Sequence, residues 1–147
     1  MFENGSEILR FDCHLHTVSD KEFKYDGESD KFISSYVDKL KSEGIGVGVI
    51  TNHNKFDYEQ YKALKKAANR NGIFILPGVE LSVKEGASSV HMLVVFNPVE
   101  WICNGIDHIS RMVNALFLGI DDPGNENTCT EKDLLTVIND MDKQNKD

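Results

Sequence analysis

Two histidines separated by one residue follow an apolar run near the start of the chain. The segment LRFDCHLHTVSD supplies Asp12, His14, His16 and Asp20 within nine positions. If residues 8–15 form a strand, its period of two places Asp12, His14 and His16 on one face. Imidazole is a ligand of zinc, iron and manganese, and a carboxylate two residues earlier can join such a site or orient a ring by hydrogen bonding. The spacing indicates a metal site; exposed histidines at a strand end are the alternative interpretation.

Three further apolar runs are followed by, or contain, a histidine or a glutamate that could bind a metal ion. The run at 45–50 is followed by TNHN with His53, the run IFILPGVELSV carries Glu80, and SSVHMLVVFN holds His91 near its start. Active sites of parallel α/β sheets lie beyond the carboxyl ends of the strands, so we expect these residues to converge in space. Imidazoles combined with one carboxylate suit zinc, manganese or iron, and a carboxylate that bridges two ions is typical of a multinuclear hydrolase.

The segments between these runs have the periodicity of helices. Apolar residues at spacings of three and four predict helices over 31–44, 56–71, 98–119 and 131–142. Asp57 is the expected N-cap of the second helix. Pro77 and Gly78 interrupt the third strand, where we expect the chain to kink. The order β-α-β-α-β-β-α-α, with buried strands that have the composition of parallel ones, indicates an α/β fold.

Composition limits the possible functions. The chain of 147 residues, 40% hydrophobic and 27% charged, fits one globular domain but is short for an eight-unit barrel of about 250 residues. A net charge of −8 argues against a broad nucleic-acid surface, although bound cations can still attract a phosphorylated substrate. Without a membrane-spanning run or a signal peptide, we expect a cytoplasmic protein with no membrane contact. Strand alternation predicts that Cys13 packs in the core.

These motifs resemble those of the PHP family, the polymerase and histidinol phosphatase domain. FDCHLHT is similar to the family's D-x-H-x-H motif, ITNHN to its T-D-H motif, PGVE to its G-x-E motif, and HMLVVF to its strand-borne histidine. Residues 8–97 look most similar to the PHP module at the N-terminus of large TrlF-type proteins, which carry an SMC-like ATPase region. The resemblance implies a distorted seven-stranded βα barrel that holds two or three divalent metals and hydrolyses phosphoesters.

The resemblance also implies roles for individual residues. Glu80 and His53 would take part in catalysis, with Glu80 bridging two ions. Family members often carry another ligand shortly after the first motif, and either Asp20 or Glu22 fills that place. The implied ligands common to both alternatives are His14, His16, His53, Glu80 and His91.

Two residues beside these ligands have a supporting role in the resemblance. Asp12 would orient an imidazole or bind a metal weakly. Asn52 stands where the family usually has Asp, so an uncharged amide occupies the position expected to support His53. The family's later strand-end histidine and D-x-H pair have no counterpart, since His108 falls within an expected helix. We therefore expect residues 1–147 to be a single PHP-like domain that is incomplete at the C-terminus, the N-terminal portion of the barrel.

Three functions are compatible with these residues. The first is metal-dependent hydrolysis of a phosphorylated small molecule, a nucleotide or a nucleic-acid end, with two or more zinc, manganese or iron ions. The second is a catalytically incomplete metal-binding or regulatory module that docks on a partner such as an ATPase. Open sheet edges of a partial barrel then predict self-association or pairing with a partner chain that completes the barrel. The third is a small α/β protein whose histidines are incidental.

Overall fold

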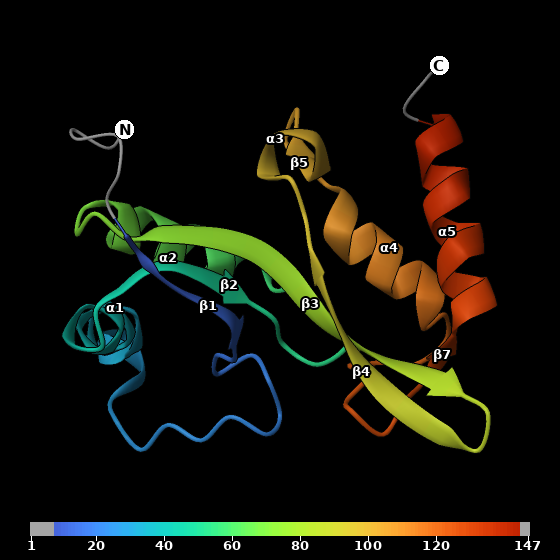
Figure 1. Cartoon of the computed structure of the whole chain (residues 1–147), viewed down its shortest axis with the longest axis horizontal. Helices are drawn as coiled ribbons and strands as arrows, with labels where there is room; N and C mark the ends of the chain where they lie inside the picture. The colour runs from blue at the N-terminus through green and yellow to red at the C-terminus, as the bar shows by residue number, and fades with distance from the viewer. Residues whose placement is uncertain (1–7, 145–147) are drawn as a thin grey trace.

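The first three strands form a parallel sheet whose carboxyl ends point the same way. The computed structural model describes residues 8–144, with side chains described through residue 141. Strands β1 (Arg10–Leu15), β2 (Ile45–Ile50) and β3 (Phe74–Glu85) are neighbours in that order, and both pairings are parallel (Figure 1). Strand β2 is almost wholly buried, as its continuous apolar sequence predicts for a parallel strand covered on both faces.

Two amphipathic helices connect these strands. A short 3-10 turn, η1 (Ser29–Lys31), leads into α1 (Phe32–Ser42), and α2 (Tyr58–Asn69) lies between β2 and β3. Asp57 is the N-cap of α2, as predicted, because its side chain accepts a hydrogen bond from the backbone N–H of Gln60. Both helices bury apolar faces in the core that they share with the sheet: Phe32, Val37 and Leu40 from α1, and Tyr61, Leu64 and Ala68 from α2.

The predicted kink at Pro77 is wrong, because β3 runs unbroken for 12 residues. The strand changes its pairing there: Pro77 is the last residue paired with β2, and Gly78 is the first paired with β4 (Ser88–Val95). Proline's fixed φ is compatible with an extended strand, and its carbonyl still accepts a hydrogen bond from Phe96 N–H at 3.0 Å. The proline therefore sits where the ladder does not require its missing N–H.

The fourth strand is less buried than predicted. Strand β4, whose direction was not predicted, is antiparallel to β3, and most of its residues are exposed. A short turn with Gly86 at φ 61° joins the two strands, and such a connection permits only an antiparallel pairing. The apolar composition of β4 thus reflects its pairing with β3 and not burial on both faces.

The helix predicted over 98–119 is divided into several elements. Asn104 and Gly105 both have positive φ, at 52° and 75°, which forms a tight hairpin turn in the middle of the segment. Asp107 then caps a new helix through hydrogen bonds from the N–H groups of Ile109 and Ser110. The elements observed in this segment are α3 (Pro98–Trp101), β5 (Ile102–Cys103), β6 (Ile106–Asp107) and α4 (His108–Leu116).

The last helix begins as the sequence predicts. Short strand β7 (Cys129–Thr130) pairs with the far half of β3 and leads into α5 (Glu131–Gln144). Thr130 and Asp133 form a reciprocal capping pair, because each side chain accepts a hydrogen bond from the other's backbone N–H. Within residues 8–144, no helix has the length and apolar character needed to cross a bilayer.

The arrangement is a mixed α/β fold around an open, mostly parallel sheet. Helices α1 and α2 flank the β1–β2 end, and α4 and α5 flank the far half of the long β3 (Figure 1). Strand β1 lies at one edge of the sheet. Its residues Phe11 and Cys13 are exposed, so the prediction that Cys13 packs in the core is wrong. Alternation does turn Cys13 away from His14, but no described element covers that face of β1.

Candidate metal centre

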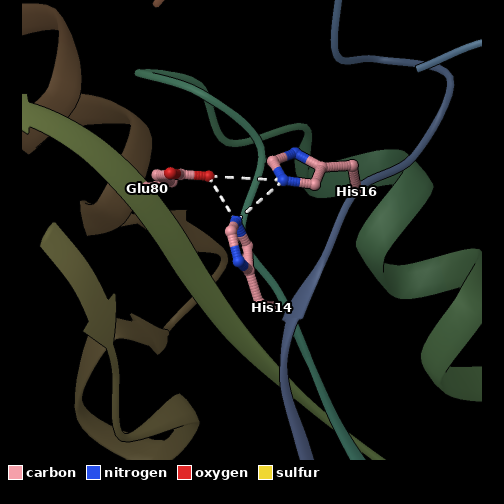
Figure 2. A group of neighbouring side chains, drawn as sticks. All are labelled: His14, His16 and Glu80. Atoms are coloured by element: carbon pink, nitrogen blue, oxygen red, sulfur yellow. Dashed lines mark hydrogen bonds and ion pairs between the residues drawn. The ribbon is translucent and has the colours of Figure 1, made fainter. Parts of the chain in front are cut away.

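Four imidazoles surround one buried carboxylate at the carboxyl ends of the parallel strands. His14 Nε2 lies 2.6 Å from Glu80 Oε2, and the Nε2 atoms of His16 and His53 each lie 3.3 Å from the same oxygen. His91 Nδ1 is 2.5 Å from the other oxygen, Oε1. Figure 2 shows His14 and His16 pointing at Glu80 from β1 and from the chain just after it. The convergence expected from the strand ends is therefore present.

Backbone pairing between the strands sets these positions. His53 follows β2 and forms a parallel bridge with Glu80, so the two side chains are held at the same level of the sheet. Glu80 N–H donates to Asn52 O at 3.1 Å, and Asn54 N–H donates to Glu80 O at 2.8 Å. His91 comes from β4, where it pairs with Ser82 and lies diagonally across from Glu80. An antiparallel strand thus supplies the fourth imidazole from the opposite side.

A second buried carboxylate, Asp20, holds the rings of His16 and His53 through their Nδ1 atoms. Asp20 Oδ2 lies 2.8 Å from His16 Nδ1 and 2.9 Å from His53 Nδ1, and it accepts the backbone N–H of His53 at 2.8 Å. A carboxylate can only accept, so both Nδ1 atoms carry the proton. The Nε2 atoms of His16 and His53 are then left with free electron pairs directed at the Glu80 side of the site, which is the state that binds a metal.

Both carboxyl groups are stabilised in their charged form. Burial acts to raise the pKa of Asp20, but hydrogen bonds from the backbone N–H groups of His53 and Glu22 and from the imidazoles outweigh it and lower the pKa from 3.8 to about 2. Burial acts in the same direction on Glu80, whose pKa is nevertheless below its ordinary value because of its hydrogen bonds with the imidazoles of His14 and His91. Two buried anions therefore face the imidazole cluster at neutral pH, where they favour a cation.

The donor set fits divalent metal ions. The Nε2 atoms of His14 and His16 face each other at 3.0 Å, so at most one proton can lie between them, and a shared cation satisfies both nitrogens. His14 and His91 have half-exposed side chains, which leaves one side of the cluster open to solvent and substrate. Three overlapping groups have ligand atoms within 4.8 Å of one another: His14, His16 and Glu80; His16, Asp20 and His53; and His53, Glu80 and His91.

Three candidate residues lie outside these groups: Glu22, Asp12 and Asn52. Of the two alternatives after the first motif, Asp20 joins the cluster, whereas Glu22 is hydrogen-bonded to Asn125 on the surface. Asp12 accepts the backbone N–H of His14 at 3.0 Å, so it shapes the strand end rather than holding a ring. Asn52 binds Thr17 through the Thr17 N–H at 2.8 Å and its hydroxyl at 2.9 Å, and so ties the loop after β1 to the end of β2.

Asn54 is a residue that the sequence analysis missed. It is fully buried, with φ 48°, and its Oδ1 accepts Ser82 N–H at 2.9 Å. Its Nδ2 donates to Gly124 O at 2.7 Å and to Asn127 O at 2.8 Å, which holds the loop 118–128 beside the metal centre. A signal was present in the sequence, since Asn54 directly follows His53 and asparagine tolerates positive φ, but its loop partners Gly124 and Asn127 are 70 and 73 residues away.

Comparison with known proteins supports the fold. No protein-family model and no curated protein matches the chain. Among solved structures, a candidate metal-dependent phosphoesterase from Bifidobacterium adolescentis matches with a TM-score of 0.51 and 22% identity, over 72% of this chain and 32% of that one. An amidohydrolase from Chromobacterium violaceum, with bound sulfate and no metal, matches with a TM-score of 0.47 and 24% identity, over 72% and 31%. The chain thus spans about a third of the length of these proteins, and the first likeness shows a shared fold.

Proposed function

We propose that this chain is a PHP-type metal-dependent phosphoesterase domain. The observation that carries the proposal is the convergence of four imidazoles and two buried carboxylates on the open end of the parallel strands. The order of the PHP-like motifs and the fold shared with the Bifidobacterium adolescentis protein add support. The residues proposed to hold the ions are His14, His16, His53, Glu80 and His91, and Asp20 is proposed to orient the rings of His16 and His53.

The chemistry follows from this donor set. Bound divalent ions supply Lewis acidity, which lowers the pKa of water and neutralises charge on the phosphoryl oxygens. Glu80 accepts from imidazoles at both of its oxygens, so it is placed to contact more than one ion. Asp20 holds the rings of His16 and His53 in the tautomer that binds metal. Water is the nucleophile in the proposed reaction, so the reaction needs no covalent serine or cysteine nucleophile.

A second candidate function is a metal-binding module that another chain completes. The observation in its favour is the open sheet, with β1 and β4 at the edges and Phe11 and Val95 exposed on them. A partner such as an ATPase, or a second copy of this chain, would then pair with an edge strand. Sedimentation across a range of concentrations distinguishes this function, since an edge that binds a second copy gives a concentration-dependent increase in mass, and a constant monomer mass argues against self-association.

Hydrolysis of p-nitrophenyl phosphate with added manganese, zinc or iron tests the proposed function. We expect turnover that requires metal and that falls at least about 100-fold in Glu80→Gln, as for loss of a group that acts on the reacting atoms. Glu59→Gln is the matched control, because Glu59 is an exposed glutamate on α2. Metal-dependent turnover that persists in the double variant His14→Ala plus His53→Ala would refute the assignment of the site.

A further inference from the structure

Two lysines lie at the rim of the metal centre and bind the same aspartate. Lys21 directly follows Asp20, and Lys55 is two residues beyond His53. Lys55 Nζ lies 2.7 Å from Asp122 Oδ1, while Lys21 Nζ lies 2.5 Å from the Asp122 carbonyl oxygen and 3.8 Å from Oδ2. The hydrogen bond from Lys55 is the main reason that the pKa of Asp122 is lowered. Asp122 therefore holds both ammonium groups, Lys55 through its carboxylate and Lys21 mainly through its backbone carbonyl.

These groups share a cavity with the metal centre. The cavity has a volume of about 100 Å³, and Asp20 and His53 line it together with Lys21, Lys55, Asp122 and two further acidic residues, Glu22 and Glu126. A ligand that enters this cavity thus meets the two ammonium groups beside Asp20 and His53. Bound divalent ions must offset the carboxylates for a phosphate to be attracted there.

The carboxylate of Asp122 is brought there by an anchored loop. Asn54, fully buried, holds the loop 118–128 through the carbonyl oxygens of Gly124 and Asn127. Asp122 itself has φ 50°, a backbone region that aspartate tolerates better than most residues. In a chain with a net charge of −8, this loop places an anion between two lysines beside the metal centre. Its carboxylate resembles a phosphate oxygen in charge and in hydrogen-bond acceptance.

We propose that Lys21 and Lys55 bind the phosphate group of the substrate and that Asp122 occupies their anionic position until the substrate displaces it. This inference rests on the proposed function and names the substrate class as a phosphomonoester. A monoester phosphate carries up to two negative charges near neutral pH, whereas a diester carries one. Two ammonium groups that exchange a single carboxylate for a dianion gain attraction, so they select the monoester.

Binding of inorganic phosphate to the manganese-loaded protein, measured by calorimetry, tests the lysine pair. We expect the double variant Lys21→Gln plus Lys55→Gln to bind phosphate at least about tenfold more weakly, since each lost charge-assisted hydrogen bond is worth about that factor. The control Lys62→Gln plus Lys66→Gln removes the same charge from the exposed face of α2 and should bind as the unmodified protein does. Equal affinity in the two double variants would overturn the proposal.

The role of Asp122 predicts a change of opposite sign. Asp122→Asn removes the competing anion, so we expect phosphate to bind severalfold more tightly than to the unmodified protein. Asp121→Asn is the matched control, because it removes one charge from the neighbouring, exposed position of the same loop. If Asp122→Asn binds phosphate no better than Asp121→Asn, Asp122 is a structural ion-pair partner and the displacement is refuted.

Kinetics separate this inference from the proposed function. The lysine double variant should raise the KM for p-nitrophenyl phosphate more than the KM for bis(p-nitrophenyl) phosphate, while the metal content stays the same. Equal effects on the monoester and the diester would contradict the monoester assignment and leave the phosphoesterase proposal standing. If the unmodified protein binds phosphate through the lysines but hydrolyses neither ester, the proposed function fails and the anion site stands.

Discussion

Replacing Asn54 with alanine removes three hydrogen bonds from the buried region next to the metal centre. The lost contacts are from Ser82 N–H at 2.9 Å and to the carbonyl oxygens of Gly124 and Asn127 at 2.7 and 2.8 Å. At about 1 kcal/mol net per hydrogen bond, their loss costs about 3 kcal/mol of the free energy of unfolding. Alanine at φ 48° adds about 1 kcal/mol, because it tolerates the left-handed region less well than asparagine.

We therefore expect Asn54→Ala to lower the free energy of unfolding by about 3 to 4 kcal/mol in urea titrations of metal-free protein. Asn71→Ala is the control, since exposed Asn71 makes one side-chain hydrogen bond, to Ala67 O at 3.1 Å, and should lose less than about 0.5 kcal/mol. Asn54→Asp keeps the acceptor for Ser82 but turns a buried anionic oxygen toward the two carbonyl oxygens, so it should not restore the loss. A loss below about 1 kcal/mol for Asn54→Ala would refute the anchoring role of this side chain.

Three further predictions concern the same region. Because the folded pKa of Asp20, about 2, lies below its ordinary 3.8, its charge stabilises the metal-free fold by about 2 kcal/mol above pH 4, and this contribution is lost as the pH falls towards 2. The difference in urea midpoint between the unmodified protein and Asp20→Asn should shrink over that range; a constant difference contradicts the linkage. Gly78→Ala should lower the melting temperature, since a Cβ there lies 2.6 Å from Val49 Cγ1 and 2.9 Å from a backbone oxygen, and overpacking costs about 1–3 kcal/mol; an unchanged melting curve would show that the strands can separate. Metal at about 100 times its dissociation constant should stabilise the fold by about 2.7 kcal/mol, and Glu80→Gln should remove this stabilisation in thermal melts with and without chelator.

The parts of the site that could be predicted depend on local patterns. His53 follows β2, and Glu80 lies within β3 just beyond the residues that pair with β2, so the parallel pairing brings the two residues together whatever the length of the connecting helix. The position of Asp57 as a cap follows from the same kind of short-range pattern. These features needed no knowledge of how distant segments pack.

Other parts depend on tertiary contacts that a sequence pattern does not contain. Spacing could not choose between Asp20 and Glu22, because both follow the strand in a turn, where alternation does not apply; the turn is fixed by Asp20 N–H donating to Thr17 O at 2.8 Å. The contacts of Lys21 and Lys55 with Asp122 span 101 and 67 residues. Periodicity alone also extended a helix across Asn104, where local turn preference prevailed.

The burial of β4 shows a third kind of error. Its apolar composition was grouped with that of the buried strands and its direction was not predicted, whereas the short turn at Gly86 determines an antiparallel hairpin that is mostly exposed. The imidazole of His91 still reaches Glu80, because an antiparallel neighbour presents side chains to the same face as its partner. The burial of the strand was therefore mispredicted, while the meeting of the two side chains was anticipated.

The metal content of the purified, reconstituted protein tests the central claim most directly. After saturation with manganese or zinc and dialysis, elemental analysis should find at least one equivalent of metal per chain. The double variant His53→Ala plus Glu80→Gln should lose that metal, and Glu59→Gln should retain it. Equal metal content in the unmodified protein and the double variant, or none in either, would contradict the account that these strand-end residues form a metal centre.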